Sequence, residues 1–423
     1  MNFLLSLIVA FTAVLPHDNE MLDAIRRDPY LAAGNLHPYI APDVRNPKKL
    51  DTPAPKGFKP FYFSYYGRHG SRHMTGDLSN ISKYVGIFDE LSAEGQLTED
   101  GEKLRSWLQW SEKEHQDNMG TLTSIGYKEE QGISRRFAKR YKRIFRQRGR
   151  RMVVSRSSPV LRSAVTGESF AMELRRNFPK LDFDVLAGDR FYFTRWDHSE
   201  VLDRAEENVV DSLVRAKFDT LAFVKKFFKD ESALRKILAG SAVDELQYMT
   251  MHILSISKCI DADADPFECF STEEIYRYAI VHNARTAAWF IHSKETGVFR
   301  DTNAGRPLIN EIICRADEAI AGNDICANLR FGHDSGVGPM FSFLHAKGYE
   351  QHVPLAETYI SWPSYEHLFM GCNLAMVFYR NRKGEVLVKI LENEKETAIP
   401  AIPSYSGPYY RWEDFKEYCS RRI

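Results

Sequence analysis

A histidine between two arginines is the part of the sequence best suited to chemistry. The run Arg68-His69-Gly70-Ser71-Arg72 joins a possible nucleophile to two guanidinium groups. Because a planar guanidinium matches the geometry of phosphate oxygens, the run predicts a phosphate-binding pocket. Nearby cations also lower the pKa of an imidazole, and a neutral imidazole nitrogen can attack phosphorus. We therefore expect His69 to be a nucleophile and Arg68 and Arg72 to bind phosphate.

Two more segments could complete this pocket. In Phe331-Gly332-His333-Asp334-Ser335-Gly336, a histidine and a carboxylic acid follow a β-favouring run. His333 could donate to the phosphate, and Asp334 could protonate the departing alkoxide. Arg162, which follows Ser157-Ser158-Pro159, could add a third guanidinium at a junction between strand and helix. A His-Asp pair alone is more often a polar surface turn, so its catalytic assignment depends on the first motif.

Strands that end at these motifs would bring them together. Phe61–Tyr66 is a short aromatic, β-favouring run, and Ala327–Phe331 is a second predicted strand. Met152–Ser155 is predicted to be a buried strand, and a helical pattern over Ser163–Leu174 follows it. This alternation predicts an α/β fold with a central, mostly parallel sheet flanked by helices. In such sheets ligands collect outside the carboxyl ends of the strands.

Composition divides the chain into an arm, a core and a cap. Seven prolines between residues 16 and 57 break up helix, and the pattern from about 190 to 290 is largely helical. An inserted helical cap domain is therefore expected. The predicted boundaries are 1–15 for a signal peptide, 16–57 for an irregular N-terminal arm, 58–189 and 291–423 for the α/β core, and 190–290 for the cap.

The beginning of the chain suggests export. Phe3–Leu15 is apolar, too short to span a bilayer, and of the length of a signal-peptide hydrophobic region. No Lys or Arg precedes this run, and the alternative is a buried amphiphilic start of the domain. Export predicts a periplasmic or secreted protein. No later segment is long and apolar enough for a transmembrane helix.

Charge gives little support for a macromolecular partner. Lys plus Arg equals Asp plus Glu at 57 each, so no net field favours nucleic acid. From Arg135 to Arg151, ten of seventeen residues are Lys or Arg, which could indicate a nucleic-acid or membrane surface. Phe137, Tyr141 and Ile144 recur there at helical spacing, which favours a solvated helix with an apolar stripe facing the core. We expect a small-molecule phosphate ester as partner, no nucleic acid and no membrane; nothing in the sequence indicates an oligomeric state.

The cysteines do not suggest a metal site. All six lie in the last two-fifths of the chain, and no two form a CxxC pair, which argues against structural zinc. An even number fits disulfides, with Cys259 and Cys269 or Cys314 and Cys326 as nearest neighbours, and buried free thiols are the alternative. Neither a metal nor another cofactor is expected.

Taken together, the motifs resemble those of a known family. The sequence is similar to the histidine acid phosphatases, and among them to the multiple inositol polyphosphate phosphatases, a group that includes bacterial phytases. The resemblance runs from about Phe61 to Pro400. It rests on Tyr66-Gly67-Arg68-His69-Gly70-Ser71-Arg72, Leu122-Thr123-Ser124-Ile125-Gly126, the Arg162 segment, Asp189-Arg190-Phe191-Tyr192, Leu329-Arg330-Phe331-Gly332-His333, Gly371-Cys372-Asn373-Leu374 and Ile390-Leu391-Glu392-Asn393-Glu394-Lys395.

The resemblance implies a phosphomonoester hydrolase that works through a phosphohistidine on His69 and acts on inositol polyphosphates such as phytate. It implies an α/β core with a helical cap and no metal. Its motifs also make His73 and Arg190 candidate substrate ligands. The implied phosphate ligands are Arg68, Arg72, Arg162 and His333.

Two departures from the family pattern bear on the assignment. The inositol-polyphosphate group usually has His-Ala-Glu where this chain has His333-Asp334-Ser335, so Asp334 is expected to be the proton donor. The residues after Arg72 lack the proline often found there. The alternatives are a general acid phosphatase acting on sugar phosphates and a catalytically silent polyanion-binding protein. A phosphoglycerate-mutase-like transferase fits less well because of the export signal and the cap.

Overall fold

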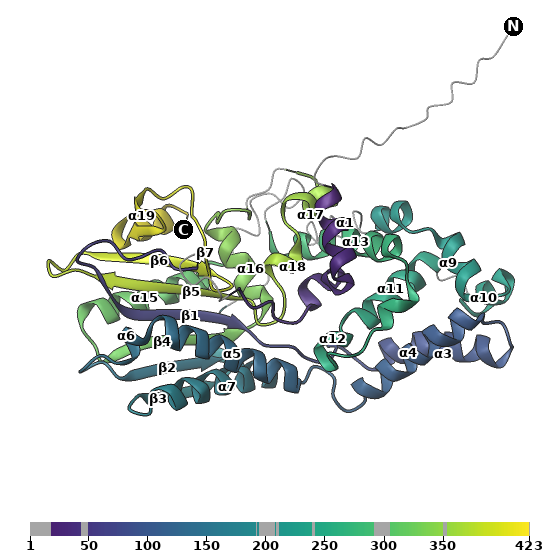
Figure 1. Ribbon diagram of the computed structural model, residues 1–423, viewed down its shortest axis with the longest axis horizontal. Helices are drawn as coiled ribbons and strands as arrows, with labels where there is room; N and C mark the ends of the chain where they lie inside the picture. Colours follow the sequence, from purple (N-terminus) through teal and green to yellow (C-terminus); the bar gives the residue numbers. More distant parts are fainter. Residues whose placement is uncertain are drawn as a thin grey trace, which may run out of the picture.

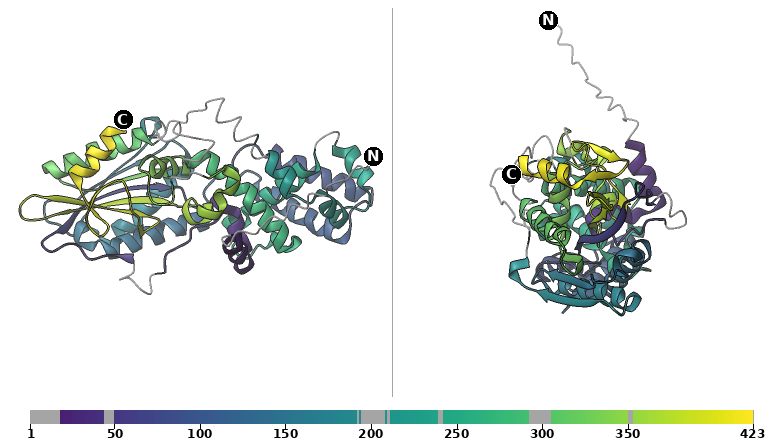
Figure 2. Two further views of the ribbon diagram at one scale, coloured as in Figure 1. Left: turned by 90° about the horizontal axis from the view of Figure 1, so that it is seen from above. Right: turned by 90° about the vertical axis from the view of Figure 1, so that its left-hand side faces the viewer.

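The computed structural model describes residues 18–43, 50–191, 193, 208, 211–238, 242–291, 305–349 and 353–422. The predicted signal peptide, residues 1–15, lies outside these ranges. The molecule is elongated, with a β-sheet at one end and a group of helices at the other (Figures 1 and 2). In Figure 1 the arrow of strand β1 (Lys59–Arg68) points toward the helical end.

In the described part of the chain, a nine-stranded mixed sheet forms the core of the α/β part. The strand order is β3-β2-β4-β1-β5-β6-β9-β8, and β7 pairs with β6. Strands β1 to β4 are parallel to one another, and β5 runs antiparallel to β1. The other bounds are Met152–Ser157 (β2), Asp182–Ala187 (β3), Ile325–Gly332 (β4), Asn373–Arg380 (β5), Val386–Glu392 (β6), Lys395–Glu396 (β7), Ser404–Ser406 (β8) and Tyr409–Arg411 (β9). The predicted α/β fold with a mostly parallel central sheet is confirmed.

The aromatic run of β1 is buried on both faces of the sheet. Phe63 and Tyr65 pack with residues of helices α5 and α7, whereas Tyr62 and Tyr66 pack with residues of α15 and α16. Because side chains alternate along a strand, one continuous aromatic run can fill two separate cores. The flanking helices are α5 (Ser124–Arg140), α6 (Lys142–Phe145), α7 (Leu161–Asn177), α15 (Arg306–Ala321), α16 (Asp334–Phe343) and α19 (Trp412–Arg421).

A third core holds the helical end together. Leu104 and Leu108 of α4 pack with Phe223 of α9 and Leu246 of α11. Helices α3 and α4 therefore belong to this core. The sequence had placed their residues, which come before position 190, in the α/β part. The predicted cap boundaries stay a prediction. The bounds are Ser79–Ala93 (α3), Glu99–His115 (α4), Thr220–Phe227 (α9), Glu231–Leu238 (α10), Val243–Ser255 (α11), Ser257–Ile260 (α12) and Thr272–Phe290 (α13).

The N-terminal arm is more regular than its prolines predicted. Helix α1 (Asp18–Arg27) and the 3₁₀ helix η1 (Pro29–Leu36) occupy much of the segment expected to be irregular. Pro29 is the first residue of η1, where a missing N–H costs nothing, and the Asp28 side chain accepts from the Tyr30 N–H. Prolines at the start of a helix therefore do not break it.

The remaining short helices connect these parts. They are η2 (Asp189–Phe191), η3 (Pro266–Cys269), η4 (Leu355–Glu357), α17 (Thr358–Ser361) and α18 (Ser364–His367). All six cysteines are free thiols in the structure; Cys314 is exposed and the other five are buried. Within the described ranges, every helix is too short or too polar to cross a membrane.

A buried ion pair ties helix α5 to the end of the sheet. The guanidinium of Arg136 donates to both carboxylate oxygens of Glu394 at 2.7–3.0 Å, and the Tyr39 hydroxyl donates to the same carboxylate at 2.6 Å. The Glu394 side chain is 4% exposed and that of Arg136 24%. Glu394 belongs to the turn between β6 and β7, next to Asn393, whose side chain accepts from the Asn373 N–H.

We predict that Glu394→Ala lowers the free energy of unfolding by about 3 kcal/mol, because it leaves a partly buried guanidinium and a partly buried hydroxyl without their acceptor. Urea denaturation measures this. The matched control is Glu318→Ala, which removes an exposed pair with Arg315, expected to contribute about 0–1 kcal/mol. Equal losses in the two variants would contradict the assignment.

Candidate active site

The ends of three parallel strands bring the predicted residues together. Arg68 at the end of β1 is paired with Gly332 at the end of β4, and Ser157 of β2 is paired with Phe331 of β4. His69, Ser158 and His333 therefore follow directly from neighbouring strands at one edge of the sheet. This edge faces the helical end of the molecule (Figure 1).

The backbone of the histidine loop is held on both sides. The His69 N–H donates to the Gly332 carbonyl at 2.9 Å, and the His69 carbonyl accepts from the Gly371 N–H at 3.0 Å. The Arg68 N–H donates to the Cys372 carbonyl at 2.9 Å. The Gly371-Cys372-Asn373 motif thus has a structural role, since its backbone fixes the position of the histidine.

A close glycine contact holds the loop against the start of helix α5. A Cβ atom on Gly70 would lie 2.5 Å from the Gly126 carbonyl oxygen, and one on Gly126 would lie 2.2 Å from the Ser71 oxygen. The Thr123 hydroxyl donates to the same Ser71 oxygen at 3.0 Å and accepts from the Gly126 N–H. The Leu122–Gly126 motif therefore combines a helix cap with a site for close backbone approach.

The His69 imidazole has the protonation state that a nucleophile needs. Its side chain is 2% exposed, and its Nδ1 lies 3.0 Å from the Gly70 carbonyl oxygen. Since a carbonyl can only accept, Nδ1 carries the proton and Nε2 keeps its lone pair. Burial, followed by the charges of Arg68, Arg72 and Arg162, holds the pKa of His69 well below its usual value. The imidazole is consequently neutral in mild acid.

Three guanidinium groups surround this imidazole. Arg68 is 1% exposed and Arg72 is 8% exposed. Burial, with Arg68 and Arg162 nearby, lowers the pKa of Arg72 to about 9. The Nε–H groups of Arg68 and Arg72 are buried and have no acceptor in the described part of the chain. Two strong donors beside a neutral imidazole are therefore available to an anion.

Arg68 is also fixed to the proton donor that the sequence predicted. Its Nη1 donates to the carbonyl oxygens of Asn35 and Leu368, both at 2.6 Å, and its Nη2 lies 2.9 Å from Asp334 Oδ2. Burial opposes ionisation of Asp334, but the charges of Arg68, His333 and Arg72 outweigh it and lower the pKa of this carboxyl. Asp334 is thus a carboxylate in this structure.

His333 completes the cluster from the end of the neighbouring strand β4. Its ring centroid lies 5.4 Å from that of His69, edge to face, and its Nε2 lies 3.2 Å from the Ser158 hydroxyl. Burial and the charge of Arg162 lower the pKa of His333. Arg162, the second residue of α7, donates through Nη1 to the Gly120 carbonyl at 3.4 Å.

Two of the predicted substrate ligands, His73 and Arg190, have other surroundings than Arg68 and Arg72. The half-buried His73 ring packs against His115 with centroids 5.4 Å apart, while the His73 carbonyl accepts from Arg72 Nη1 at 2.8 Å. Burial lowers the pKa of His73. Arg190 follows β3, three strands away from β1, which is roughly 14 Å across the sheet. It is exposed and stacks on Phe191, so the structure does not bring it to the cluster.

Sequence reasoning missed the contribution of the N-terminal arm. Asn35 in η1 donates through Nδ2 to Asp334 Oδ2 at 3.3 Å, and its carbonyl accepts from Arg68. Its Oδ1 lies 3.1 Å from Nε2 of His282 on α13. Ser158 was also not singled out, although it adjoins a recognised motif. No local pattern marks Asn35, because its partners lie far away in the chain.

Metal binding was not expected at this site. Within the described ranges, no three His, Cys, Asp or Glu side chains are grouped so that they could hold a metal ion. The positive charge at the site comes from the arginines. Independence from a metal stays a prediction.

Comparisons with known proteins define the class of fold. No protein-family model matches the chain, and no curated protein matches its sequence. Solved structures do match: the chain has the α/β fold with a helical domain found in phytases and histidine acid phosphatases.

Three solved structures illustrate this similarity. The multiple inositol polyphosphate phosphatase of Bifidobacterium longum, in complex with inositol hexasulfate, is 16% identical, with a TM-score of 0.70 over 91% of this chain and 96% of that one. The phytase from D. castellii is 15% identical, with a TM-score of 0.67 over 93% and 85%. The phytase from Citrobacter braakii is 15% identical, with a TM-score of 0.55 over 86% and 98%.

We predict that Asn35→Ala shifts the alkaline limb of the pH–rate profile to higher pH. The Asn35 amide donates to the carboxylate form of Asp334, so its loss raises the pKa of that group. An acid with a raised pKa keeps its proton to higher pH. The measurement is kcat against pH with an alkyl phosphate. Asn177→Ala, at the far end of α7, is the control and should leave the profile unchanged; a downward shift in Asn35→Ala would contradict the prediction.

Proposed function

We propose that the protein is a phosphomonoester hydrolase that transfers the phosphoryl group of its substrate to His69. The observation that carries this proposal is a buried, neutral imidazole with a free Nε2 lone pair among three guanidinium groups. Such an arrangement both provides a nucleophile and neutralises the charge of a transferring phosphoryl group.

In the first step, the lone pair of His69 Nε2 forms a bond to phosphorus. The bond between phosphorus and the ester oxygen breaks, and its electron pair goes to that oxygen, which takes a proton from the Asp334 carboxyl. Arg68, Arg72 and Arg162 balance the charge of the phosphoryl oxygens, and His333 adds a donor. The products are an alcohol and a phosphohistidine.

Asp334 needs a proton for this step although the charges of Arg68, His333 and Arg72 lower its pKa. The positive charges that lower its pKa are the same ones that bind phosphate. A bound phosphate anion compensates these charges, and the pKa of the Asp334 carboxyl then rises. In the second step, the Asp334 carboxylate takes a proton from the attacking water, the phosphohistidine bond breaks, and neutral His69 is restored with inorganic phosphate as product.

Inositol polyphosphates such as phytate are the proposed substrates. Two of the similar structures are phytases, and one inositol polyphosphate phosphatase has bound inositol hexasulfate. The chain offers these ligands a cluster of buried arginines that suits an anionic ester. With the apolar start of the chain, we also propose that the enzyme works outside the cytoplasm, as a periplasmic or secreted protein.

We predict that His69→Ala abolishes turnover, because no other group in the cluster has a free imidazole lone pair beside the arginines. Acid-labile, base-stable phosphate should be trapped on His69 when labelled substrate is quenched during turnover. The control is Ser158→Ala, which should keep the adduct. A fully active enzyme without any trapped phosphohistidine would disprove the covalent mechanism.

We predict that the loss caused by Asp334→Asn depends on the leaving group. An inositol alkoxide must be protonated as it departs, and a positioned acid contributes about 10²- to 10⁴-fold. The variant should therefore lose most of its kcat on phytate and much less on p-nitrophenyl phosphate, whose leaving group needs no proton. Both rates are followed by phosphate release. Equal losses on the two substrates would show that Asp334 positions the phosphate or the fold instead.

A further inference from the structure

The basic run from Arg135 to Arg151 separates into two parts in the structure. The arginines of its first part are paired: Arg135 with Glu173, Arg136 with Glu394 and Arg140 with Asp51. The apolar stripe predicted for this run is buried in the core, as Phe137, Tyr141 and Ile144 are at most 2% exposed. The second part of the run lies beyond α5, and its side chains have other surroundings.

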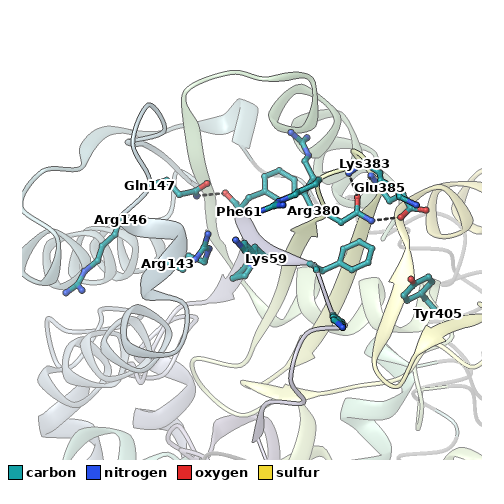
Figure 3. A pocket seen from close by; sticks show the side chains of 15 residues that line it. Lys59, Phe61, Arg143, Arg146, Gln147, Arg380, Lys383, Glu385 and Tyr405 are labelled. Carbon is teal, nitrogen blue, oxygen red and sulfur yellow. Dashed lines mark hydrogen bonds between the residues drawn. The ribbon is translucent and has the colours of Figure 1, made fainter.

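Arg143 and Arg146 of this second part line a cavity of about 1010 Å³ (Figure 3). The other walls come from the segment that enters β1 and from the turn that follows β5, which are far apart in the sequence. Seven cations from these three segments line the cavity: Lys56, Lys59, Arg143, Arg146, Arg380, Arg382 and Lys383. Their convergence is a property of the fold that no single motif shows.

Within the described part of the chain, the positive charge of this cavity is largely without carboxylate partners. Its one lining carboxylate is Glu385, which accepts from the Asn381 amide and lies 3.8 Å from Arg411. Among the described residues, no carboxylate pairs with Lys59, Arg143 or Arg382, nor with Lys56 or Lys383. For a chain whose formal net charge is zero, this is a strong local excess of positive charge.

Apolar walls and fixed donors give the cavity a defined shape. Phe58, Phe61 and Tyr405 line it, and the Arg380 guanidinium stacks on the Phe61 ring with 4.4 Å to the centroid. The Gln147 amide donates to the Phe61 carbonyl at 2.7 Å, which connects the α6 side to β1 (Figure 3). The cations thus line a hollow rather than a flat or extended surface, although the guanidinium of Arg146 points away from the others and stacks on Phe178 (Figure 3).

This cavity is separate from the His69 cluster. It lies at the beginning of β1, whereas His69 follows the end of that strand. Ten residues of extended strand span roughly 30 Å at about 3.3 Å each. A single small ligand therefore cannot reach both places.

We propose that this cavity is a second anion site, which binds a compact small molecule carrying several phosphate or sulfate groups. Several cations that line one hollow match several anionic groups on one small scaffold better than a single phosphate. A long nucleic acid would instead need a basic path that extends beyond the hollow. This site does not depend on turnover at His69.

Calorimetric titration with inositol hexasulfate, which a phosphatase does not hydrolyse, tests the proposal. We expect two binding events per wild-type chain. Arg143→Ala/Arg382→Ala should weaken one event about 10- to 100-fold while phytate turnover stays unchanged. The matched control is Lys142→Ala/Arg148→Ala, which removes two exposed cations of the same basic run that do not line the cavity.

Arg72→Ala separates this site from the proposed function, because it should remove turnover and the other binding event but keep the event at the cavity. The proposal is overturned if Arg143→Ala/Arg382→Ala binds two hexasulfates as tightly as the wild type, or if the matched control loses as much affinity. Tighter binding of a 20-nucleotide single strand than of hexasulfate, sensitive to Arg143→Ala/Arg382→Ala, would also overturn it in favour of nucleic acid.

Discussion

The candidate site depends on one constraint, which is that positively charged arginines are buried around the His69 imidazole. Arg68 and Arg72 are almost fully buried beside His69, and this burial, followed by the charges of Arg68 and Arg162, lowers the pKa of Arg72. Such a cluster is unfavourable unless its donors have acceptors. Arg68 meets this need with two backbone carbonyls and the Asp334 carboxylate, whereas the Nε–H groups of Arg68 and Arg72 have no acceptor among the described residues. The cluster is therefore held by the fold and still offers two donors to an anion.

The surrounding backbone is arranged so that this cluster cannot spread apart. The contact between Gly70 and Gly126 leaves no room for a Cβ atom on either side, and Gly371 donates to the carbonyl of His69 from the opposite side. A nucleophile must stay within a few tenths of an ångström of its attack geometry to be effective. The motifs around the histidine thus act as supports of its position, which explains why they surround the site without all contributing side chains to it.

The sequence predicted those parts of the molecule that depend on residues close to one another in the chain. The aromatic run of β1, the strand ends and the residues His69, His333 and Asp334 could be found because each strand leads directly into its functional residue. The helix in the N-terminal arm was missed because prolines were counted without regard to their position at a helix start. Asn35 could not be found, since its contact with Asp334 spans 299 positions and only the folded chain creates it. Arg190 was included because of its motif, but strand order places it away from β1.

The His69 cluster and the distal cavity lie at opposite ends of β1, and they differ in how far water screens their positive charges. At the His69 cluster the cations are buried, so solvent and salt screen them weakly and their charges change the pKa values of neighbouring groups. Lys59, Arg143 and Arg382 are exposed around the distal cavity, where water stabilises each charge and little energy is needed to hold them close together. Anion binding at the cavity must therefore weaken steeply as ionic strength rises, whereas binding at His69 must depend more on geometry and pH. A protein with no net charge can in this way hold two anion sites with different physical properties, because each is built from local charge that the rest of the fold balances elsewhere.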